Sequence, residues 1–203
     1  LKGFDFNPEK AREYLKAAGF PGGKGFPEIN FTANNGGGGK HDLIAAAISK
    51  MLEENLGIKI NMLSLPFKDY LLAVESGKSD FFSASWAADY PSPESFLNIL
   101  NSKHLRKDSV ESHYLNAPRY VNALYDSIVR LGLKEPNIQA KNKLFMRAEQ
   151  MAVDDAAIMP IVYQINSRIL QPYVRNFPVN AMECRDFSRV WIDKDAFEKF
   201  KGK

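Results

Sequence analysis

The chain has 203 residues, enough for one large domain or for one lobe of a larger protein. Hydrophobic residues make up 45% of it and charged residues 25%, which is ordinary for a globular protein and excludes general disorder. The formal net charge of +3 is too small to indicate nucleic-acid binding, and no apolar run approaches the roughly 18 residues of a membrane span.

The first half of the chain alternates helices and strands. Asn7, Pro8 and Gly19 carry the start and stop signals of a helix. Alternation with short Gly- and Pro-containing connections predicts an α/β fold with a mixed, mostly parallel sheet flanked by helices. The elements that apolar periodicity predicts next are a strand at 29–33, a helix at 40–55, a strand at 58–65, a short helix at 66–76 and a strand at 80–87.

The second half is mainly helical and then loses its pattern. Helices are predicted at 93–100, 119–131 and 138–153, and a late strand at 157–165 contains Pro160, which indicates an edge or a bulge. Residues after about Gln171 carry little helix or strand signal, so we expect residues 172–203 to form an arm that packs on something outside this chain. The chain begins with Leu1 rather than Met and ends abruptly, and we expect a fragment or a processed product.

A glycine run, Gly36–Gly39, separates the strand at 29–33 from the helix at 40–55. Backbone N–H groups of such a loop can bind an anion. A phosphate-binding loop, however, needs Ser or Thr after its lysine to reach Mg²⁺, and here His41 follows Lys40. A flexible connection is therefore favoured, while His41 or Lys40 facing a ligand carboxylate stays open.

The segment Asp80–Pro93 combines a strand, a tryptophan, an aspartate and a proline-rich turn. Ligands of open α/β sheets sit at the carboxyl ends of strands, and a strand edge can pair with an extended peptide through its main chain. The Asp89 carboxylate at such a position can hold a cationic amine. The alternative is that Trp86 is a core residue and Asp89 caps the turn before Pro91.

Catalytic and metal-binding patterns are missing from the sequence. It contains no G-x-S-x-G, no H-E-x-x-H and no cysteine pair. Its three histidines and its one cysteine, Cys184, have no known ligand spacing, and Cys184 has no partner for an internal disulfide. The sequence predicts a binding protein that is not an enzyme and uses no cofactor or metal.

Four motifs together resemble a known family. In chain order they are NPEKAREYLKAAGFPG at 7–22, NLGIKI at 55–60, SWAADYPSPESFL at 85–97 and AIMPIVY at 157–163. Their order and spacing, from about residue 4 to 193, resemble the family 5 extracellular solute-binding proteins, the peptide and nickel receptors of bacterial ABC importers.

The resemblance implies a type II periplasmic-binding-protein fold, in which two lobes close on a ligand by a hinge. Residues 1–171 are then expected to form the C-terminal ligand-binding lobe, with the N-terminal lobe absent from this chain. Residues 172–203 would pack back on that missing lobe. The implied partners are a peptide ligand, the missing lobe and an ABC permease in the cytoplasmic membrane, with no nucleic acid, and the implied location is periplasmic or lipid-anchored at the cell surface.

The same resemblance assigns roles to residues of the third motif. Asp89 corresponds to the aspartate that pairs with the α-amino group of a bound peptide. Ser85 and Ala87 correspond to positions whose main chain bonds the extended peptide, and Trp86 and Tyr90 to neighbours that shape the pocket.

Other positions also belong to the candidate site, and some of them carry a residue that differs from the one common in the family. His41 corresponds to a loop position that can face the carboxyl end of the peptide. Phe67 replaces a common Trp, and Ser83 and Val74 replace arginines that pair with a peptide carboxylate in some members. The full candidate set of ligand-binding residues is Asn34, His41, Phe67, Ser83, Ser85, Trp86, Ala87, Asp89 and Tyr90.

Two alternatives stay open at this point. The ligand could be a nickel complex or an oligosaccharide instead of a peptide, or the protein could be a sensory or adhesion receptor. Retention of Asp89 favours a ligand with a free amine, and thus an oligopeptide.

Overall fold

The computed structural model describes residues 2–36, 39–105, 113–163, 165, 167–180 and 185–202. Cys184 and two glycines of the Gly36–Gly39 run lie outside the described residues. The chain forms two compact units, residues 1–86 with 93–158 and residues 87–92 with 159–203. Among the described residues, no helix is long and apolar enough to cross a membrane.

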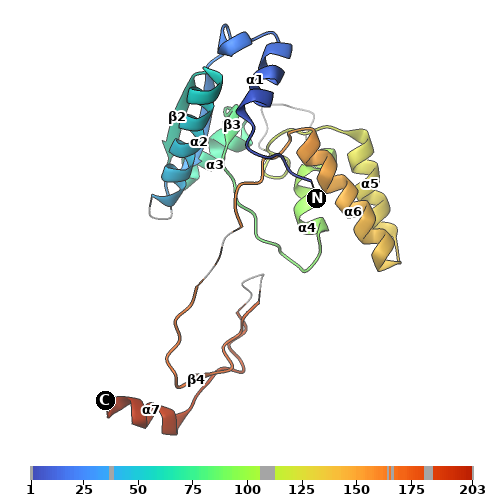
Figure 1. The fold of residues 1–203 in the computed structure, drawn as a ribbon. Helices are drawn as coiled ribbons and strands as arrows, with labels where there is room; N and C mark the ends of the chain where they lie inside the picture. The colour runs from blue at the N-terminus through green and yellow to red at the C-terminus, as the bar shows by residue number, and fades with distance from the viewer. Residues whose placement is uncertain are drawn as a thin grey trace. The chain divides into compact units, whose positions relative to one another are not determined.

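The first unit consists of an α/β part followed by a helical part (Figure 1). The elements of the α/β part are α1 (Pro8–Ala17), η1 (Pro21–Gly23), β1 (Ile29–Asn34), α2 (Lys40–Leu56), β2 (Ile60–Leu65), α3 (Phe67–Glu75) and β3 (Phe81–Phe82). The elements of the helical part are α4 (Glu94–Leu97), η2 (Asn98–Leu100), η3 (Ser102–His104), α5 (Ala123–Lys134) and α6 (Ile138–Asp154).

The sheet of this unit is parallel, in the order β2-β1-β3. β1 pairs with β2 from Ile29 opposite Ile60 to Asn34 opposite Leu65, and with β3 at two positions. The β1–α2–β2 crossover runs from the central strand to one edge, and the β2–α3–β3 crossover runs back across the sheet in the opposite direction. Right-handed crossovers that run in opposite directions place their helices on opposite faces, so α2 and α3 flank the sheet on its two sides. The predicted α/β class with a mostly parallel sheet flanked by helices is confirmed, and the three described strands of this sheet are all parallel.

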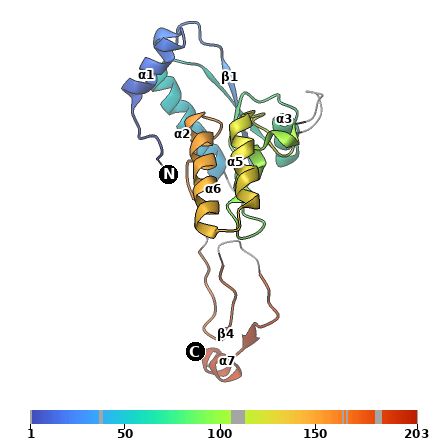
Figure 2. The same ribbon diagram turned by 90° about the vertical axis from the view of Figure 1, so that its right-hand side faces the viewer.

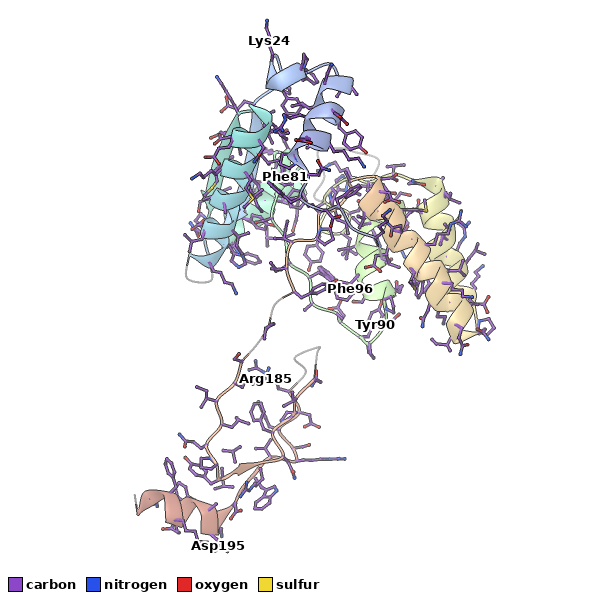
Figure 3. The ribbon with its side chains drawn as sticks, viewed as in Figure 1. Lys24, Phe81, Tyr90, Phe96, Arg185 and Asp195 are labelled. Atoms are coloured by element: carbon purple, nitrogen blue, oxygen red, sulfur yellow. The ribbon has the colours of Figure 1, made fainter. Side chains whose placement is uncertain are left out.

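Apolar side chains on the central strand form one of two buried clusters. Phe31 and Ala33 of β1 are buried with Ala45 of α2. The Phe31 ring lies 4.5 Å from the ring of Phe81 on β3, which is partly buried and packs against this cluster (Figure 3). Thr32, whose side chain points to the opposite face of β1, is also fully buried, so β1 is covered on both sides, as a central parallel strand requires.

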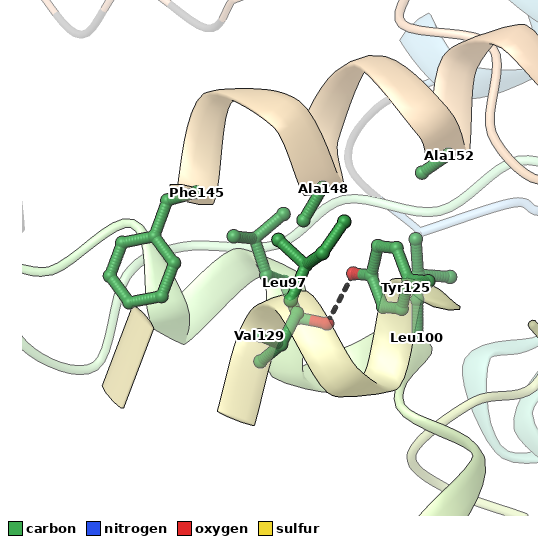
Figure 4. Close-up of a cluster of buried hydrophobic side chains, with 8 residues drawn as sticks. Leu97, Leu100, Tyr125, Val129, Phe145, Ala148 and Ala152 are labelled. Carbon is green, nitrogen blue, oxygen red and sulfur yellow. Dashed lines mark hydrogen bonds between the residues drawn. The ribbon is translucent and has the colours of Figure 1, made fainter. Parts of the chain in front are cut away.

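The second cluster joins α4, η2 and the hairpin of α5 and α6, which lie side by side (Figure 2). At its centre the hydroxyl group of Tyr125 donates a 2.6 Å hydrogen bond to the Leu97 carbonyl (Figure 4). The α5–α6 contact is close because Gly132 faces Phe145, where a Cβ atom would come within 2.5 Å of the ring. The buried members of this cluster are Leu97, Leu100, Tyr125, Ile128, Val129, Phe145, Ala148 and Ala152.

Two predicted strands differ from the structure. The strand predicted at 80–87 is limited to Phe81–Phe82, because after the Ser83 amide bonds to Thr32 no further residue of that segment pairs with β1. The strand predicted at 157–165 is wrong over its described residues, which have no regular structure. Pro160 lacks an N–H group, and residues 159–163 are exposed and have no described strand to pair with.

The helix predicted at 119–131 begins later, at Ala123. Arg119 has φ +57, which is incompatible with a right-handed helix. The side chain of Asn122 instead caps α5 by accepting hydrogen bonds from the amides of Leu124 and Tyr125.

The second unit contains regular structure that the fading sequence pattern did not predict. Its elements are β4 (Val174–Arg175), β5 (Trp191–Ile192), antiparallel to β4, and α7 (Lys194–Lys201). Asp193 caps α7 by accepting from the Ala196 amide, and it also pairs with Arg175 at 2.9 Å. The Tyr173 ring packs against two phenylalanines of α7, Phe197 and Phe200, at 4.9 and 5.4 Å.

Candidate functional site

The carboxyl ends of the three parallel strands carry three of the candidate residues. Asn34 ends β1, Phe67 follows β2 after one intervening proline, and Ser83 follows β3 directly. Because parallel strands end at the same edge of a sheet, these residues share that edge. The connections after β1 and β2 run in opposite directions, which makes this edge a topological switch point, where α/β sheets usually bind ligands.

At the end of β1, the Asn34 side chain supports its own loop. Its Oδ1 accepts a 2.7 Å hydrogen bond from the Gly36 amide, and the Asn35 amide continues the pairing to the Leu65 carbonyl at 2.9 Å. His41 is half-buried in the first turn of α2, next to Asp42, which accepts a 2.6 Å bond from Ser64 Oγ. Asn34 is thus a loop-forming residue as well as a candidate.

At the start of α3, Phe67 presents an aromatic face to solvent. Its side chain is 58% exposed, and its ring stacks on Tyr70 with 6.3 Å between centroids and 18° between planes. Tyr70 itself is buried, and burial raises the pKa of its hydroxyl group to about 12. That hydroxyl therefore stays protonated and donates a 2.6 Å hydrogen bond to the Ser83 carbonyl.

Beyond β3, the main chain leaves the sheet. The Ser83 amide bonds to the Thr32 carbonyl at 3.1 Å, and its carbonyl is taken by Tyr70, so both main-chain groups of Ser83 are used. Ala84 and Ser85 are exposed, and within the described part of the chain their backbone groups make no hydrogen bond. The main chain of these two residues is available to an added strand.

Trp86 is half-buried and carries an unpartnered donor. Its indole Nε1 is buried and has no hydrogen-bond partner among the described residues. The ring lies 6.3 Å from that of Tyr114, at 52° to it. A buried N–H group without an acceptor is costly, and it is satisfied when an acceptor arrives.

Ala87, Asp89 and Tyr90 lie in the second unit, in the short segment 87–92. All three side chains are exposed. The Ser92 amide bonds to the Tyr90 carbonyl at 2.7 Å, which closes a tight turn around Pro91. The turn predicted for this proline-rich segment is confirmed.

The arrangement suits binding by main chain and aromatic side chains. Sequence reasoning missed Tyr70, which it took for a residue of an apolar stripe, and Tyr114, which it placed in a surface loop. The signal for Tyr70 was its position three residues after Phe67, which puts both rings on one face of a helix. Over the described ranges, no three His, Cys, Asp or Glu side chains come close enough to hold a metal ion.

Comparison with known proteins gives a family match and several relatives. Residues 1–108 match the family described as bacterial extracellular solute-binding proteins, family 5 Middle. The periplasmic murein peptide-binding protein MppA of Escherichia coli K12 is 29% identical over 181 residues, which cover 89% of this chain and 32% of MppA.

Two further relatives differ in what their names say they bind. The periplasmic oligopeptide-binding protein OppA of Salmonella typhimurium is 30% identical over 83% of this chain and 29% of OppA. The probable deoxycholate-binding periplasmic protein YgiS of Escherichia coli K12 is 31% identical over 69% of this chain and 24% of YgiS. The chain spans about a third or less of the length of these relatives.

Solved structures agree with the sequence relatives. The structure of the murein tripeptide-binding protein MppA of Escherichia coli matches with a TM-score of 0.77 and 27% identity, over 91% of this chain and 34% of that one. The fold is that of a type II periplasmic binding protein, as the sequence motifs implied.

Proposed function

Because the chain belongs to the bacterial extracellular solute-binding proteins of family 5, we propose that it supplies one ligand-binding lobe of the substrate receptor of an ABC importer. We infer that the ligands are oligopeptides, since two relatives, MppA and OppA, are named for binding peptides. The receptor binds its ligand without chemical turnover and delivers it to a permease in the cytoplasmic membrane. Its relatives are binding proteins, which supports a role other than that of an enzyme.

One observation carries the proposal. Ala84 and Ser85 lie just beyond the end of β3, at the switch point, where they are exposed and their main chain forms no hydrogen bond with a described residue. An extended peptide adds alongside this segment through main-chain hydrogen bonds. Main-chain recognition does not read side chains, so the receptor accepts many peptide sequences, with Phe67 and Trp86 contributing to their pockets.

Asp89 is our candidate for the group that binds the peptide's α-amino end. Its side chain is exposed, and the residue lies three positions after Trp86, directly before the turn closed by Tyr90 and Ser92. A charge-assisted bond between this carboxylate and an ammonium group places the amino end of the ligand at residue 89.

We further propose that a second, N-terminal lobe completes the cleft and that residues 172–203 pack on it. This is supported by the length of the relatives, of which the chain spans a third or less. It is also supported by large apolar side chains that are exposed within residues 172–203, since extended apolar surface marks an interface. These side chains include Val179, Phe187, Trp191, Ile192 and Phe200.

The proposed location is outside the cytoplasmic membrane. MppA, OppA and YgiS are all named as periplasmic proteins. We propose the same compartment, with either a periplasmic or a lipid-anchored form of the complete receptor.

A second candidate is the same receptor with a ligand that has no free amine. The relative YgiS is named for probable binding of deoxycholate, so family membership alone leaves the ligand class open. Nickel complexes and oligosaccharides belong to this alternative, and a sensory or adhesion role is a separate one.

The test is calorimetric titration of the complete two-lobed protein with a library of di- to pentapeptides, each with a free and with an acetylated amino terminus. We expect binding of the free forms and its loss on acetylation. Equal binding of both forms would retain the receptor and remove Asp89 from its proposed role. Absence of binding across the library would overturn the peptide proposal and favour the second candidate.

The variant Asp89→Ala tests the residue itself. We expect it to lose at least about 1.5–3 kcal/mol of peptide affinity, the range for a hydrogen bond to a charged group. Asp5→Ala is the matched control, because it removes an exposed carboxylate from a residue in the first unit that is no candidate for the site. An unchanged dissociation constant for Asp89→Ala would contradict the role.

A further inference from the structure

We propose that Tyr70 is a positioning residue that ends strand pairing at Ser83 and thereby presents the main chain of residues 84–86 to the ligand. The inference rests on the proposed function, because its ligand is the extended peptide. It concerns a side chain that does not itself touch that peptide and that sequence patterns place among core residues.

The hydrogen bonds of Ser83 show how the pairing ends. In a parallel ladder, a paired residue donates its amide to a carbonyl of the neighbouring strand, and its own carbonyl accepts from the amide two residues further along that strand. The Ser83 amide bonds to the Thr32 carbonyl, so the regular partner of the Ser83 carbonyl would be the Asn34 amide. The Ser83 carbonyl accepts the Tyr70 hydroxyl at 2.6 Å instead. A side chain thus takes the acceptor with which the next ladder bond would be made.

Tyr70 is held firmly enough to act as such a stop. Its side chain is buried, and its ring stacks on Phe67. Its amide bonds to the Pro66 carbonyl at 2.9 Å, at the start of α3. The other end of α3 is held too, because Arg119 Nη2 donates to the Glu75 carbonyl at 2.9 Å. The hydroxyl group therefore stands at a fixed point relative to β1 and β3.

The consequence is a defined starting point for an added strand. If pairing with β1 continued past Ser83, the segment that follows would be drawn into the sheet, and its main-chain groups would be used there. With the carbonyl of Ser83 held by Tyr70, Ala84 and Ser85 lie exposed outside the sheet. Loss of the hydroxyl should loosen this segment and weaken peptide binding without removing any contact to the peptide.

Tyr70→Phe in the complete two-lobed protein tests this directly, since it keeps the ring and deletes only the hydroxyl group. The chain offers a matched control in Tyr125→Phe, because Tyr125 is also buried and also donates a 2.6 Å bond to a main-chain carbonyl, that of Leu97 in the helical cluster. The two variants should lose similar stability, which urea unfolding measures. The binding probe is a tetrapeptide with a free amino terminus chosen as the tightest of the library.

We expect Tyr70→Phe to weaken binding about three- to tenfold and Tyr125→Phe to change it less than about twofold, as the deletion of one hydrogen bond implies. Amide hydrogen exchange supplies a second readout, in which only Tyr70→Phe should lose peptide-induced protection at residues 84–86. Wild-type affinity in Tyr70→Phe, or equal weakening by both variants, would overturn the positioning role alone. A wild-type protein that binds no peptide would overturn the proposed function, and this inference with it.

Discussion

The guanidinium group of Arg119 lies directly against Gly77, so close that a Cβ atom at residue 77 would stand 2.6 Å from Arg119 Cζ. The same guanidinium donates hydrogen bonds to the carbonyls of Glu75 and Ala117, both at 2.9 Å. A cationic group at the carboxyl end of α3 satisfies a terminal carbonyl of the helix and opposes its dipole. The helical part of the first unit is thereby tied to the helix that carries Phe67 and Tyr70.

Gly77→Ala should destabilise the protein for two reasons. Residue 77 has φ +72, which costs a residue with a Cβ atom about 1–2 kcal/mol, and the new methyl group also displaces the Arg119 guanidinium. Gly25→Ala is the control, because Gly25 has φ +76 and nothing within 4 Å of its Cβ position. Urea unfolding of both variants separates the two causes. Equal losses would show that the Arg119 contact contributes nothing.

Gly132→Ala should also destabilise, although alanine favours helices by about 1 kcal/mol over glycine. A Cβ atom at residue 132 would lie 2.5 Å from the Phe145 ring, so α5 and α6 must separate or the ring must leave its rotamer. We expect a net loss of about 1–3 kcal/mol in the free energy of unfolding, as for an overpacked core.

The double variant Gly132→Ala with Phe145→Leu checks the cause of that loss. A smaller side chain at residue 145 should relieve the clash, so the double variant should be more stable than the sum of the two single losses implies. If the losses in the free energy of unfolding simply add, the destabilisation by Gly132→Ala does not come from the contact between α5 and α6.

Stability should depend on Asp155 at acid pH. Hydrogen bonds from the Tyr120 hydroxyl at 2.6 Å and from Nδ2 of the Asn122 side chain at 2.8 Å hold the pKa of the Asp155 carboxyl below its usual value. A lowered pKa in the folded chain means that this stabilisation is present above the unfolded value of 3.8 and is lost as the pH falls through the folded value.

Tyr120→Phe is the variant that checks this dependence. It should lower the free energy of unfolding at pH 7 by no more than about 1 kcal/mol, because the carboxylate is exposed to solvent. The difference from the wild type should shrink below about pH 4, as measured by urea unfolding across the acid range. A difference that stays constant down to pH 3 would assign the effect to packing of the ring instead.

Phe67→Ala should separate ligand binding from stability. Phe67 is 58% exposed, so its removal should cost less than about 1 kcal/mol of stability, while peptides that use its aromatic face should bind several-fold more weakly. Leu72→Ala is the control on the same helix, because Leu72 is 62% exposed and is not a candidate site residue. Calorimetry of the complete protein with the same peptide set compares them. Equal affinities of the two variants would remove Phe67 from the site.

Much of the α/β part follows from short-range signals that the sequence displays. Asn7 and Pro8 start α1 as predicted, and Gly57, with φ +68, ends α2 as a left-handed cap. β1 matches its predicted bounds to within one residue, β2 begins at Ile60 instead of residue 58, and their parallel pairing follows from the helix that connects them. Asp193 is the cap of a helix that the same reasoning overlooked, in a region where few apolar residues mark a face.

The length of β3 and the start of α5 depend on contacts between distant residues. The Phe81–Ala87 segment has the composition of a strand, yet the strand ends at Phe82. The reason is that Tyr70, thirteen residues before Ser83, donates a hydrogen bond to the Ser83 carbonyl, which would otherwise form the next bond to β1. Likewise, Arg119 adopts a left-handed conformation while it reaches the end of α3, and α5 begins only after it.

Local sequence therefore decides caps, periodicity and the class of the fold, since these involve residues within a turn or two of one another. The candidate site is decided at longer range. Asn34, Phe67 and Ser83 lie far apart along the chain, and only the parallel order β2-β1-β3 brings the ends of their strands to one edge. A hydrogen bond such as that from Tyr70 to Ser83 leaves no mark in composition or periodicity, because its geometry exists only once the helix has packed on the sheet.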